Sequence, residues 1–353
     1  MNKKAKIKLI RFLIILIPIV IILVCGVVLF SKFKNNENNN KQNPTEQTNN
    51  EKPVEKKIQI VDLNSKSRPI AVMINNLKDA QPYQSGLQDA YLVYEIIVEG
   101  GITRMMAVFK DANTARIGSV RSSRHYYLDY ALENDAIYVH FGWSERARAD
   151  ISSLGVNNIN GLYDNAFWRD KSLNLASEHT AYTSMEKINN VIATKGYRTE
   201  TNKDLLLDYS ADEIDLSNKT DAIKADNVNV VYSSYQTTSY VYDAESKTYL
   251  RSMNGKKHID YVTKKQYTVK NIITYQINNY SFDDYGRQDL KNIGSGNGYY
   301  ITDGYAIPIT WQKSSREAQT IYKYLDGTEI KVNDGNTFIQ IQPADKKLEI
   351  TGN

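Results

Sequence analysis

Apolar and polar positions divide the 353-residue chain into three stretches. Residues 12–30 are an unbroken run of nineteen uncharged residues, and a helix that rises about 1.5 Å per residue would carry them across the roughly 30 Å hydrocarbon core of a membrane. Residues 31–59 are rich in Asn, Gln, Lys and Glu, which predicts a disordered tether because so few apolar groups cannot offset the entropy of folding. From residue 60 onward, short apolar runs separated by turn residues predict a folded region.

In residues 60–215 the apolar runs suggest strands and helices in succession. Strands are expected at 69–74, 91–98, 103–109 and 136–140, with a tight turn at Gly100 and Gly101, and helices at 122–134, at 144–154 and beyond Ile188. This succession predicts a layered α/β sandwich domain.

Residues 216–350 have a different pattern, because their apolar runs are short and bounded by Asn, Asp and Gly. Strands are expected at 239–242, 248–251, 267–275, 305–311 and 338–341. We therefore expect a second, β-rich subdomain, with its boundary near residues 217–219.

Basic residues orient the long apolar run. Five of them precede it, whereas only Lys32 and Lys34 follow closely. The positive-inside rule therefore predicts a cytoplasmic tail at residues 1–11, one transmembrane helix from Phe12 to Phe30 in the plasma membrane, and an extracytoplasmic folded region. The run exceeds the roughly 7–15 apolar residues of a cleaved signal peptide.

The single cysteine, Cys25, lies within this run. Its surroundings partly match the lipid-attachment site of bacterial lipoproteins, but Val24 stands where that site has a small residue, and the apolar run continues to Phe30. A transmembrane anchor is the preferred interpretation and a lipidated Cys25 the alternative. In the first case the exported region has no thiol and no disulfide.

The net charge changes sign once the anchor is set aside. The chain has 44 Lys and Arg residues and 40 Asp and Glu residues, but seven of the basic residues and none of the acidic ones precede residue 35. The remainder holds 37 basic and 40 acidic residues, a net charge of −3. This balance argues against a nucleic-acid partner, which requires a basic surface on the folded region.

Several motifs are shared with one bacterial family. They are Arg68 to Asn76, Val93 to Glu95, Glu99 to Arg104, Ile117 to Arg124, His140 to Ser144, Phe167 to Asp170, a motif at His179, Tyr249 to Ser252, Gly255 with His258 to Asp260, Trp311, and Asn333 to Thr337. In order and spacing they resemble the YerB-like family of bacterial lipoproteins with paired N- and C-terminal domains of unknown function. The resemblance covers nearly all of residues 60–345. It implies a layered α/β fold with a second, β-rich domain, and no settled activity.

Arginines provide the candidate binding site. Arg121 and Arg124 are three residues apart where a helix is expected to begin, so they would share one face of its first turn. Cations are unfavourable at that end of a helix dipole, but a bound anion would engage both the free N–H groups and the guanidinium groups. A phosphate or carboxylate of a cell-wall polymer, or of another envelope protein, fits this chemistry. The expected ligand-binding residues are Arg104, Arg121, Ser122, Arg124, His140 and His179.

A catalytic alternative rests on Glu95, Glu99 and His140. Two glutamates four residues apart on a strand have Cα atoms about 13 Å apart, whereas the carboxyl groups of glycosidases stand roughly 5–9.5 Å apart. This leaves a peptidoglycan lyase resembling lytic transglycosylases, with Glu99 as a single acid, or a hydrolase centred on His140. Salt bridges between these glutamates and nearby arginines are the competing interpretation.

No cofactor and no metal site are expected, because the four histidines match no zinc-ligand spacing and no cysteine stands beside them. Three interpretations remain open. The favoured one is a membrane-anchored binding or scaffold protein of the cell envelope, which is not an enzyme. The others are the wall-directed enzyme and a structural module whose matched polar residues join the two subdomains through buried salt bridges.

Overall fold

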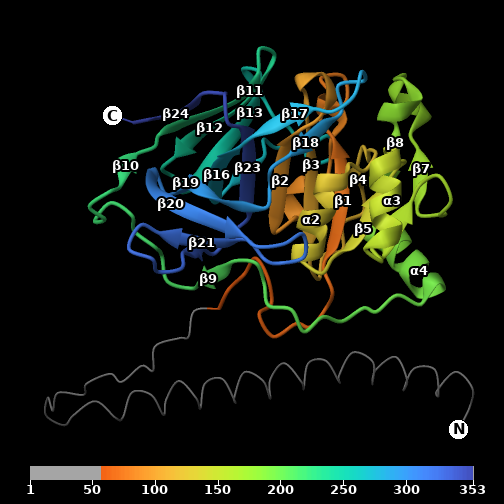
Figure 1. The fold of residues 1–353 in the computed structure, drawn as a ribbon, viewed down its shortest axis with the longest axis horizontal. Coiled ribbons are helices and arrows are strands. Elements are labelled where there is room, and N and C mark those ends of the chain that lie inside the picture. Colours follow the sequence, from red (N-terminus) through yellow and green to blue (C-terminus); the bar gives the residue numbers. More distant parts are fainter. Residues whose placement is uncertain (1–56, 353) are drawn as a thin grey trace, which may run out of the picture. The chain divides into compact units, whose positions relative to one another are not determined.

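Strands dominate the computed structural model, which describes residues 57–352 (Figure 1). This part of the chain contains twenty-four strands, three α-helices and five short 3₁₀ helices. None of its helices is long and apolar enough to cross a membrane. The predicted transmembrane segment from Phe12 to Phe30, and nearly all of the predicted tether, lie outside the described residues.

The described fold consists of helices, one large sheet, a second sheet of six strands and three small sheets. The helices are α2 (His125–Glu133), α3 (Glu145–Ser153), α4 (Met185–Lys195), η1 (Gln81–Tyr83), η2 (Leu87–Asp89), η3 (Glu99–Gly101), η4 (Lys171–Leu173) and η5 (Ser177–His179). The large sheet contains β1 (Ile70–Asn75), β2 (Leu92–Ile97), β3 (Thr103–Phe109), β5 (Ile137–His140), β6 (Asn158–Asn160), β10 (Ile223–Lys224), β16 (Asn271–Ile277), β19 (Gly294–Thr302), β20 (Tyr305–Lys313), β21 (Ile321–Tyr324) and β23 (Thr337–Pro343).

The second sheet contains β11 (Asn227–Ser233), β12 (Gln236–Asp243), β13 (Thr248–Met253), β14 (Lys256–Lys257), β15 (Thr268–Val269) and β24 (Leu348–Thr351). Three small sheets contain β4 (Ile117–Gly118), β7 (Phe167–Arg169), β8 (Ala181–Thr183), β9 (Asp208–Ser210), β17 (Asn279–Ser281), β18 (Gln288–Leu290) and β22 (Lys331–Asn333).

Strands from both halves of the chain share the large sheet, whose order is β10-β20-β19-β16-β23-β2-β3-β1-β5-β6, with β21 paired to β20. Near its middle, β23 pairs in parallel with β16 on one side and with β2 on the other. On the far side of β2, the hairpin partner β3 is antiparallel to both β2 and β1, and β5 and β6 follow β1 in parallel. The two halves therefore form one continuous sheet.

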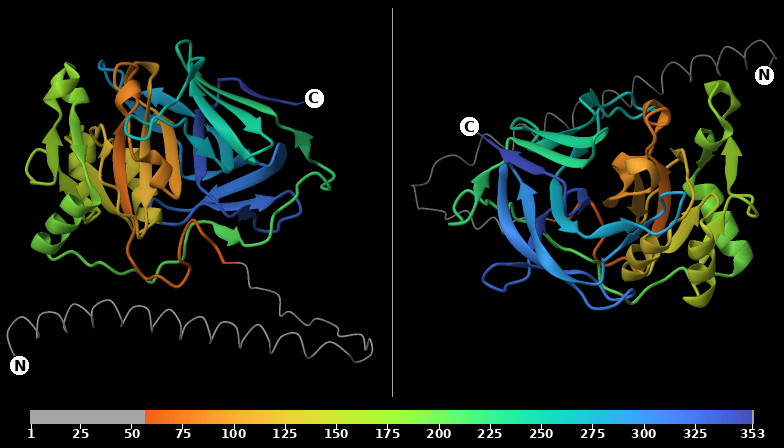
Figure 2. Two further views of the ribbon diagram at one scale, coloured as in Figure 1. Left: turned by 180° about the vertical axis from the view of Figure 1, so that it is seen from behind. Right: turned by 45° about the horizontal axis from the view of Figure 1, so that its top comes forward.

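Both faces of this sheet are covered. Tyr127 and Tyr130 of α2 pack with Tyr94 and Met106 on one face, while Ile188 of α4 belongs to the core on the other. That second core also contains the inward side chains of the six-stranded sheet, which packs over the second-half strands of the large sheet and over β2 (Figure 2). The three α-helices gather at the opposite end, near β1 and β5 (Figure 1).

The prediction of a layered α/β sandwich was wrong. Individual elements at 70–75, 92–97, 103–109, 137–140 and 145–153 match the expected ones closely. Their packing differs, because β16, β19, β20 and β23 extend the same sheet, and a second sheet rather than a layer of helices covers much of one face. The described chain is a mainly β protein.

Candidate anion-binding site

The predicted site residues lie at one edge of the large sheet. Parallel strands β1, β5 and β6 end there at Asn75, His140 and Asn160. Strand β2 runs in the same direction and leads to Glu99, and Arg104 of β3 lies opposite Asn75. The loops that lead into α2 and α3 meet the same edge. Ligands of α/β proteins commonly bind at the carboxyl ends of parallel strands.

Two loops run side by side at this edge. The backbone N–H of Phe141 donates to the carbonyl oxygen of Arg121 at 3.0 Å, and that of Ser123 donates to Gly142 at 2.9 Å. Ser123 and Trp143 form a parallel bridge. Residues 121–124 are thus held in an extended conformation by residues 141–144.

This pairing corrects the expected start of α2. The helix begins at His125, so Arg121 and Ser122 precede it, and Arg124 is its N-cap without a side-chain capping bond. The hydroxyl of Ser122 instead donates to the carbonyl of Phe141 at 3.0 Å. In α3 the usual arrangement holds, since Ser144 Oγ accepts from Ala147 N at 3.3 Å.

Glu99 is the centre of the arginine cluster. Arg124 Nε donates to Glu99 Oε1, and Arg104 Nη2 lies 3.6 Å from Glu99 Oε2. Arg104 Nη1 also donates to the Ser122 carbonyl at 2.7 Å. Burial raises the pKa of Glu99, but the positive charges of Arg104 and Arg124 outweigh it and hold the pKa below its ordinary value. Glu99 is therefore an ionised partner of two arginines.

Arg121 completes the cluster without a carboxylate of its own. It makes no ion pair with a described residue, and its buried Nε atom has no hydrogen-bond partner among them. Burial lowers its pKa, with Arg124 and Arg169 adding repulsion and Glu178 and Glu99 opposing it. Burial, with the charge of Arg124, lowers the pKa of Arg104 to about 10. The cluster thus contains three arginines, and its one directly bonded carboxylate, Glu99, pairs with two of them.

The two predicted histidines lie at the same edge but in different surroundings. His140 Nδ1 lies 2.7 Å from the Gly142 carbonyl, and burial lowers the pKa of His140 to about 4, so this imidazole is neutral. His179 Nδ1 lies 2.9 Å from Asn75 Nδ2. Both histidines are buried, and both tie site loops to the ends of strands.

Glu95 does not join the arginine cluster. It is completely buried on β2, where Oε2 accepts from Arg251 Nη2 at 2.7 Å and Oε1 accepts from Thr103 Oγ1 at 2.8 Å and from Thr238 Oγ1 at 2.9 Å. Arg251 also bonds His258. The carboxylate therefore joins the two sheets, and a substrate does not reach it.

Three residues at this edge were missed. Asn160 ends β6, while Trp143 and Tyr163 lie in the loops after β5 and β6. Trp143 stands within the His140 to Ser144 motif, which was a usable signal. Nothing in the local sequence distinguished Asn160 or Tyr163 from ordinary loop residues.

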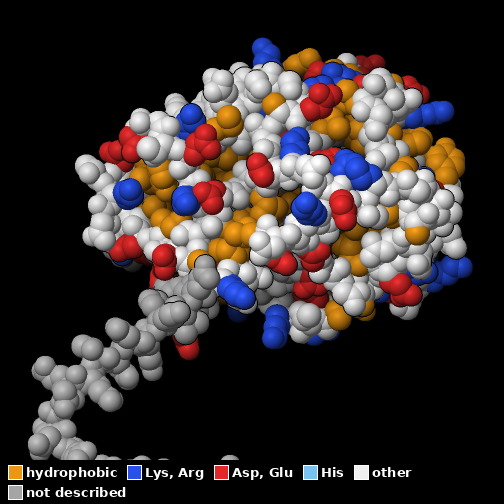
Figure 3. Space-filling model, turned by 90° about the horizontal axis from the view of Figure 1, so that it is seen from below, with side chains coloured by type: hydrophobic (Ala, Val, Ile, Leu, Met, Phe, Trp, Pro, Cys, Tyr) orange, Lys and Arg blue, Asp and Glu red, His pale blue; other side chains and the backbone are white. Residues whose placement is uncertain are grey.

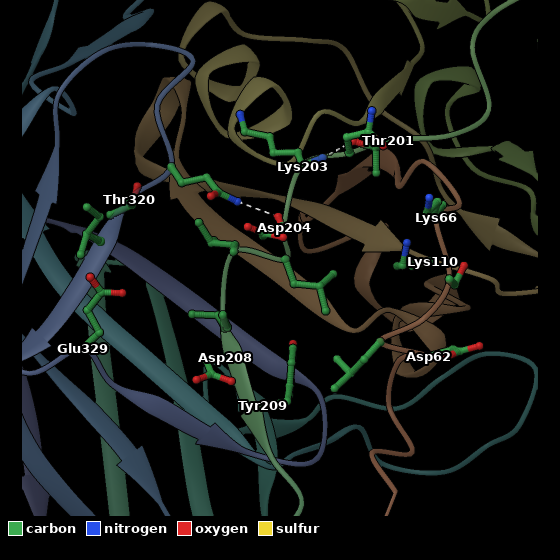
Figure 4. Close-up of a pocket in the computed structure, with 18 of the residues that line it drawn as sticks. Asp62, Lys66, Lys110, Thr201, Lys203, Asp204, Asp208, Tyr209, Thr320 and Glu329 are labelled. Carbon is green, nitrogen blue, oxygen red and sulfur yellow. Dashed lines mark hydrogen bonds between the residues drawn. The ribbon is translucent and has the colours of Figure 1, made fainter.

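A cavity of ≈ 630 Å³ lies elsewhere (Figure 4). Its lining includes segments 62–66 and 201–209. Figure 3 shows the molecule from below, where apolar side chains lie between charges of both signs. Lys203 Nζ is engaged by the carbonyls of Leu132 and Glu317, and Lys110 Nζ by that of Ser67. The arginine cluster is not part of this lining, and the mixed charges indicate no particular ligand.

The fold and this edge define a mainly β protein whose two halves are joined by two buried ion pairs, Glu95 with Arg251 and Glu133 with Lys313. An arginine cluster lies at the end of its parallel strands. Residues 58–198 match the N-terminal domain, and residues 228–339 the C-terminal domain, of the family described as "Protein of unknown function (DUF3048)".

"Putative lipoprotein YerB" of Bacillus subtilis (strain 168) is 33% identical over 282 residues, which span 78% of this chain and 81% of that protein. The crystal structure of the YerB protein from Bacillus subtilis is similar with a TM-score of 0.71 and 30% identity, covering 81% of this chain and 94% of that one. The chain therefore belongs to the YerB-like family with paired domains of unknown function, as the resemblance in sequence indicated.

Proposed function

We propose that this chain is a binding protein of the bacterial cell envelope that takes up an anionic group at the arginine cluster. The observation that carries the proposal is the excess positive charge of the cluster, because Arg104 and Arg124 share the carboxylate of Glu99 and Arg121 makes no ion pair with a described residue. A phosphate or carboxylate would pair with Arg121 and reduce the repulsion among the arginines. Its source is a cell-wall polymer or another envelope protein.

The location rests on the sequence and on the relative. The run from Phe12 to Phe30 would hold the chain in the plasma membrane, with the folded part outside. The name of the Bacillus subtilis relative, a lipoprotein, supports a membrane-associated place in the envelope. In this chain the proposed anchor is the helix.

Binding to purified poly(glycerol phosphate), measured by titration calorimetry on the full-length protein in detergent, tests the proposal. Arg121→Gln should lower the affinity about tenfold, because one charge-assisted hydrogen-bond donor is lost. Arg198→Gln is the matched control, since Arg198 is 52% exposed and paired with Asp135 away from the cluster. Equal affinity of the wild type and Arg121→Gln, with both folded, would overturn the proposal.

A structural interaction module is the second candidate, favoured by the pair between Glu95 and Arg251, in which neither side chain is exposed. In this case the arginine cluster binds no small anion. Cross-linking in intact cells would then capture the same protein partner with the Arg121→Gln variant as with the wild type. A catalytic role is less favoured. A general acid needs a raised pKa, whereas the charges of Arg104 and Arg124 lower the pKa of Glu99.

A further inference from the structure

An aromatic surface lies beside the arginine cluster. Tyr163 and Leu162, in the loop after β6, are 72% and 53% exposed. The ring of Tyr163 lies 5.9 Å from that of Trp143, and the Arg148 guanidinium lies 5.8 Å from the Trp143 ring. Grouped apolar side chains at a protein surface mark contacts with ligands or partners more often than isolated ones.

Buried polar contacts hold this loop in place. Asn160, only 2% exposed, accepts at Oδ1 from the backbone N–H of Gly142 at 2.9 Å and from that of Leu162 at 3.1 Å. Asp164 accepts from Asn160 N at 2.7 Å and pairs with Lys195 at 3.0 Å. The exposed ring of Tyr163 and the partly buried ring of Trp143 are thus presented by a fixed backbone, as recognition surfaces require.

The same contacts connect the rings to the arginines. Gly142 and Trp143 belong to the segment that is hydrogen-bonded along residues 121–124. Phe141, one residue earlier, is covered by the Arg169 guanidinium at 4.3 Å from its ring centroid. Flat apolar rings and excess positive charge therefore share one edge of the sheet.

Resting on the proposed function, we infer that the ligand is a glycan that carries acidic groups. The apolar C–H face of a sugar ring stacks on Tyr163 and Trp143, and a phosphate or carboxylate substituent reaches Arg121. A bare polyanion would use only the arginines, and a neutral glycan only the rings. Both features together select an acidic saccharide over either simpler ligand.

Four probes separate these contributions in titrations of the full-length protein in detergent. They are sugar-free poly(glycerol phosphate), a neutral chitin oligosaccharide, and two acidic glycans, one bearing phosphate and one bearing carboxylate groups. The wild type should bind at least one acidic glycan about tenfold more tightly than poly(glycerol phosphate), because stacking adds to the ionic contact. The preferred acidic glycan identifies the substituent.

Tyr163→Ala should remove that tenfold preference and leave poly(glycerol phosphate) binding unchanged. Because Tyr163 is exposed, Tyr163→Ala should leave the fold intact. Tyr285→Ala is the matched control, since Tyr285 is 81% exposed and lies between β17 and β18. No preference for either acidic glycan, or a preference that survives in Tyr163→Ala, overturns this inference while leaving the anion site intact. If Arg121→Gln leaves the affinity for every probe unchanged, the proposed function is overturned instead.

Discussion

Arg251 Nη2 donates to Glu95 Oε2 at 2.7 Å, and neither side chain is exposed to solvent. The bond joins β13 of the six-stranded sheet to β2 of the large sheet, across 156 residues of sequence. A buried pair of this kind contributes little net stability compared with apolar residues, but a single buried charge without its partner is costly. The two halves of this chain therefore depend on each other's charge.

We expect Arg251→Met to lower the free energy of unfolding by about 3–5 kcal/mol, because it leaves the Glu95 carboxylate buried without its cationic partner. Adding Glu95→Gln should recover part of the loss, since the double variant contains neither charge. Urea unfolding followed by circular dichroism measures both. Lys331→Met is the control, because its pair with Asp208 is exposed and its loss should cost less than about 1 kcal/mol. A double variant less stable than Arg251→Met would contradict this account.

Substitution of Glu99 should destabilise the fold, whereas substitution of Arg121 should not. Glu99→Gln leaves Arg104 and Arg124 without their carboxylate, so we expect a loss of about 1–3 kcal/mol in urea unfolding. Arg121→Gln removes a charge that makes no ion pair with a described residue, and it should change stability by less than about 0.5 kcal/mol, or raise it, as is common for residues kept for binding. If Arg121→Gln were as damaging as Glu99→Gln, Arg121 would be a structural residue.

Stability should fall as the pH drops from about 6.5 to about 4. Burial lowers the pKa of His140 to about 4 and lowers those of His125 and His258 as well. Within this window the unfolded chain binds protons that the folded chain does not, so acid favours unfolding. For His140 alone the effect approaches about 3 kcal/mol across the window.

Urea unfolding at about pH 7 and about pH 5 measures this dependence. His140→Gln should be less stable at neutral pH, yet its stability should change less between the two pH values. An unfolding free energy that is flat over this range in the wild type, or a slope that His140→Gln leaves unchanged, would contradict the assignment of a neutral His140.

Asn160→Ala should loosen the loop that presents Tyr163. It removes the acceptor for the backbone N–H groups of Gly142 and Leu162, and we expect a loss of about 1–3 kcal/mol with faster amide exchange at both residues. Hydrogen exchange with mass spectrometry detects the change. Asn160→Asp keeps an acceptor oxygen and should preserve the protection; equal exchange in the two variants would show that the side chain does not hold the loop.

The anchor can be tested by chemistry at Cys25. With a transmembrane helix from Phe12 to Phe30, the protein should require detergent for extraction, and its intact mass should equal that of the unmodified chain. Cys25→Ser should remain in the membrane fraction. A cleaved, acylated N-terminus at Cys25 would show that lipid, rather than the helix, attaches the protein.

Local patterns located individual elements well. The β2–β3 hairpin follows from two apolar runs around Gly100 and Gly101, and α3 from an N-cap serine at 144. The pairing of β2 with β23 left no local signal, because parallel partners far apart in sequence are selected by tertiary packing. For this reason the sheet that spans both halves, and with it the fold class, was not foreseen.

Local sequence also explains why some of the candidate residues lie close together, whereas their role in binding stays a prediction. Glu99 and Arg104 flank one turn, and Arg124 reaches them at the edge where parallel strands end. The start of α2 was misjudged because serines at 122 and 123 resemble caps, whereas the loop at 141–144 holds them extended. Arg251 could not be assigned to Glu95, since many arginines were available and only the packed sheets select one.

The position of β23 has a consequence for how the protein is made. Residues 337–343 are synthesised long after residues 92–97, yet they fill the gap between β2 and β16. Until they arrive, β2 has an open edge, and the earlier strands cannot complete their sheet. A newly made chain therefore stays vulnerable to proteases and to pairing with other nascent chains until residues 337–343 have been made.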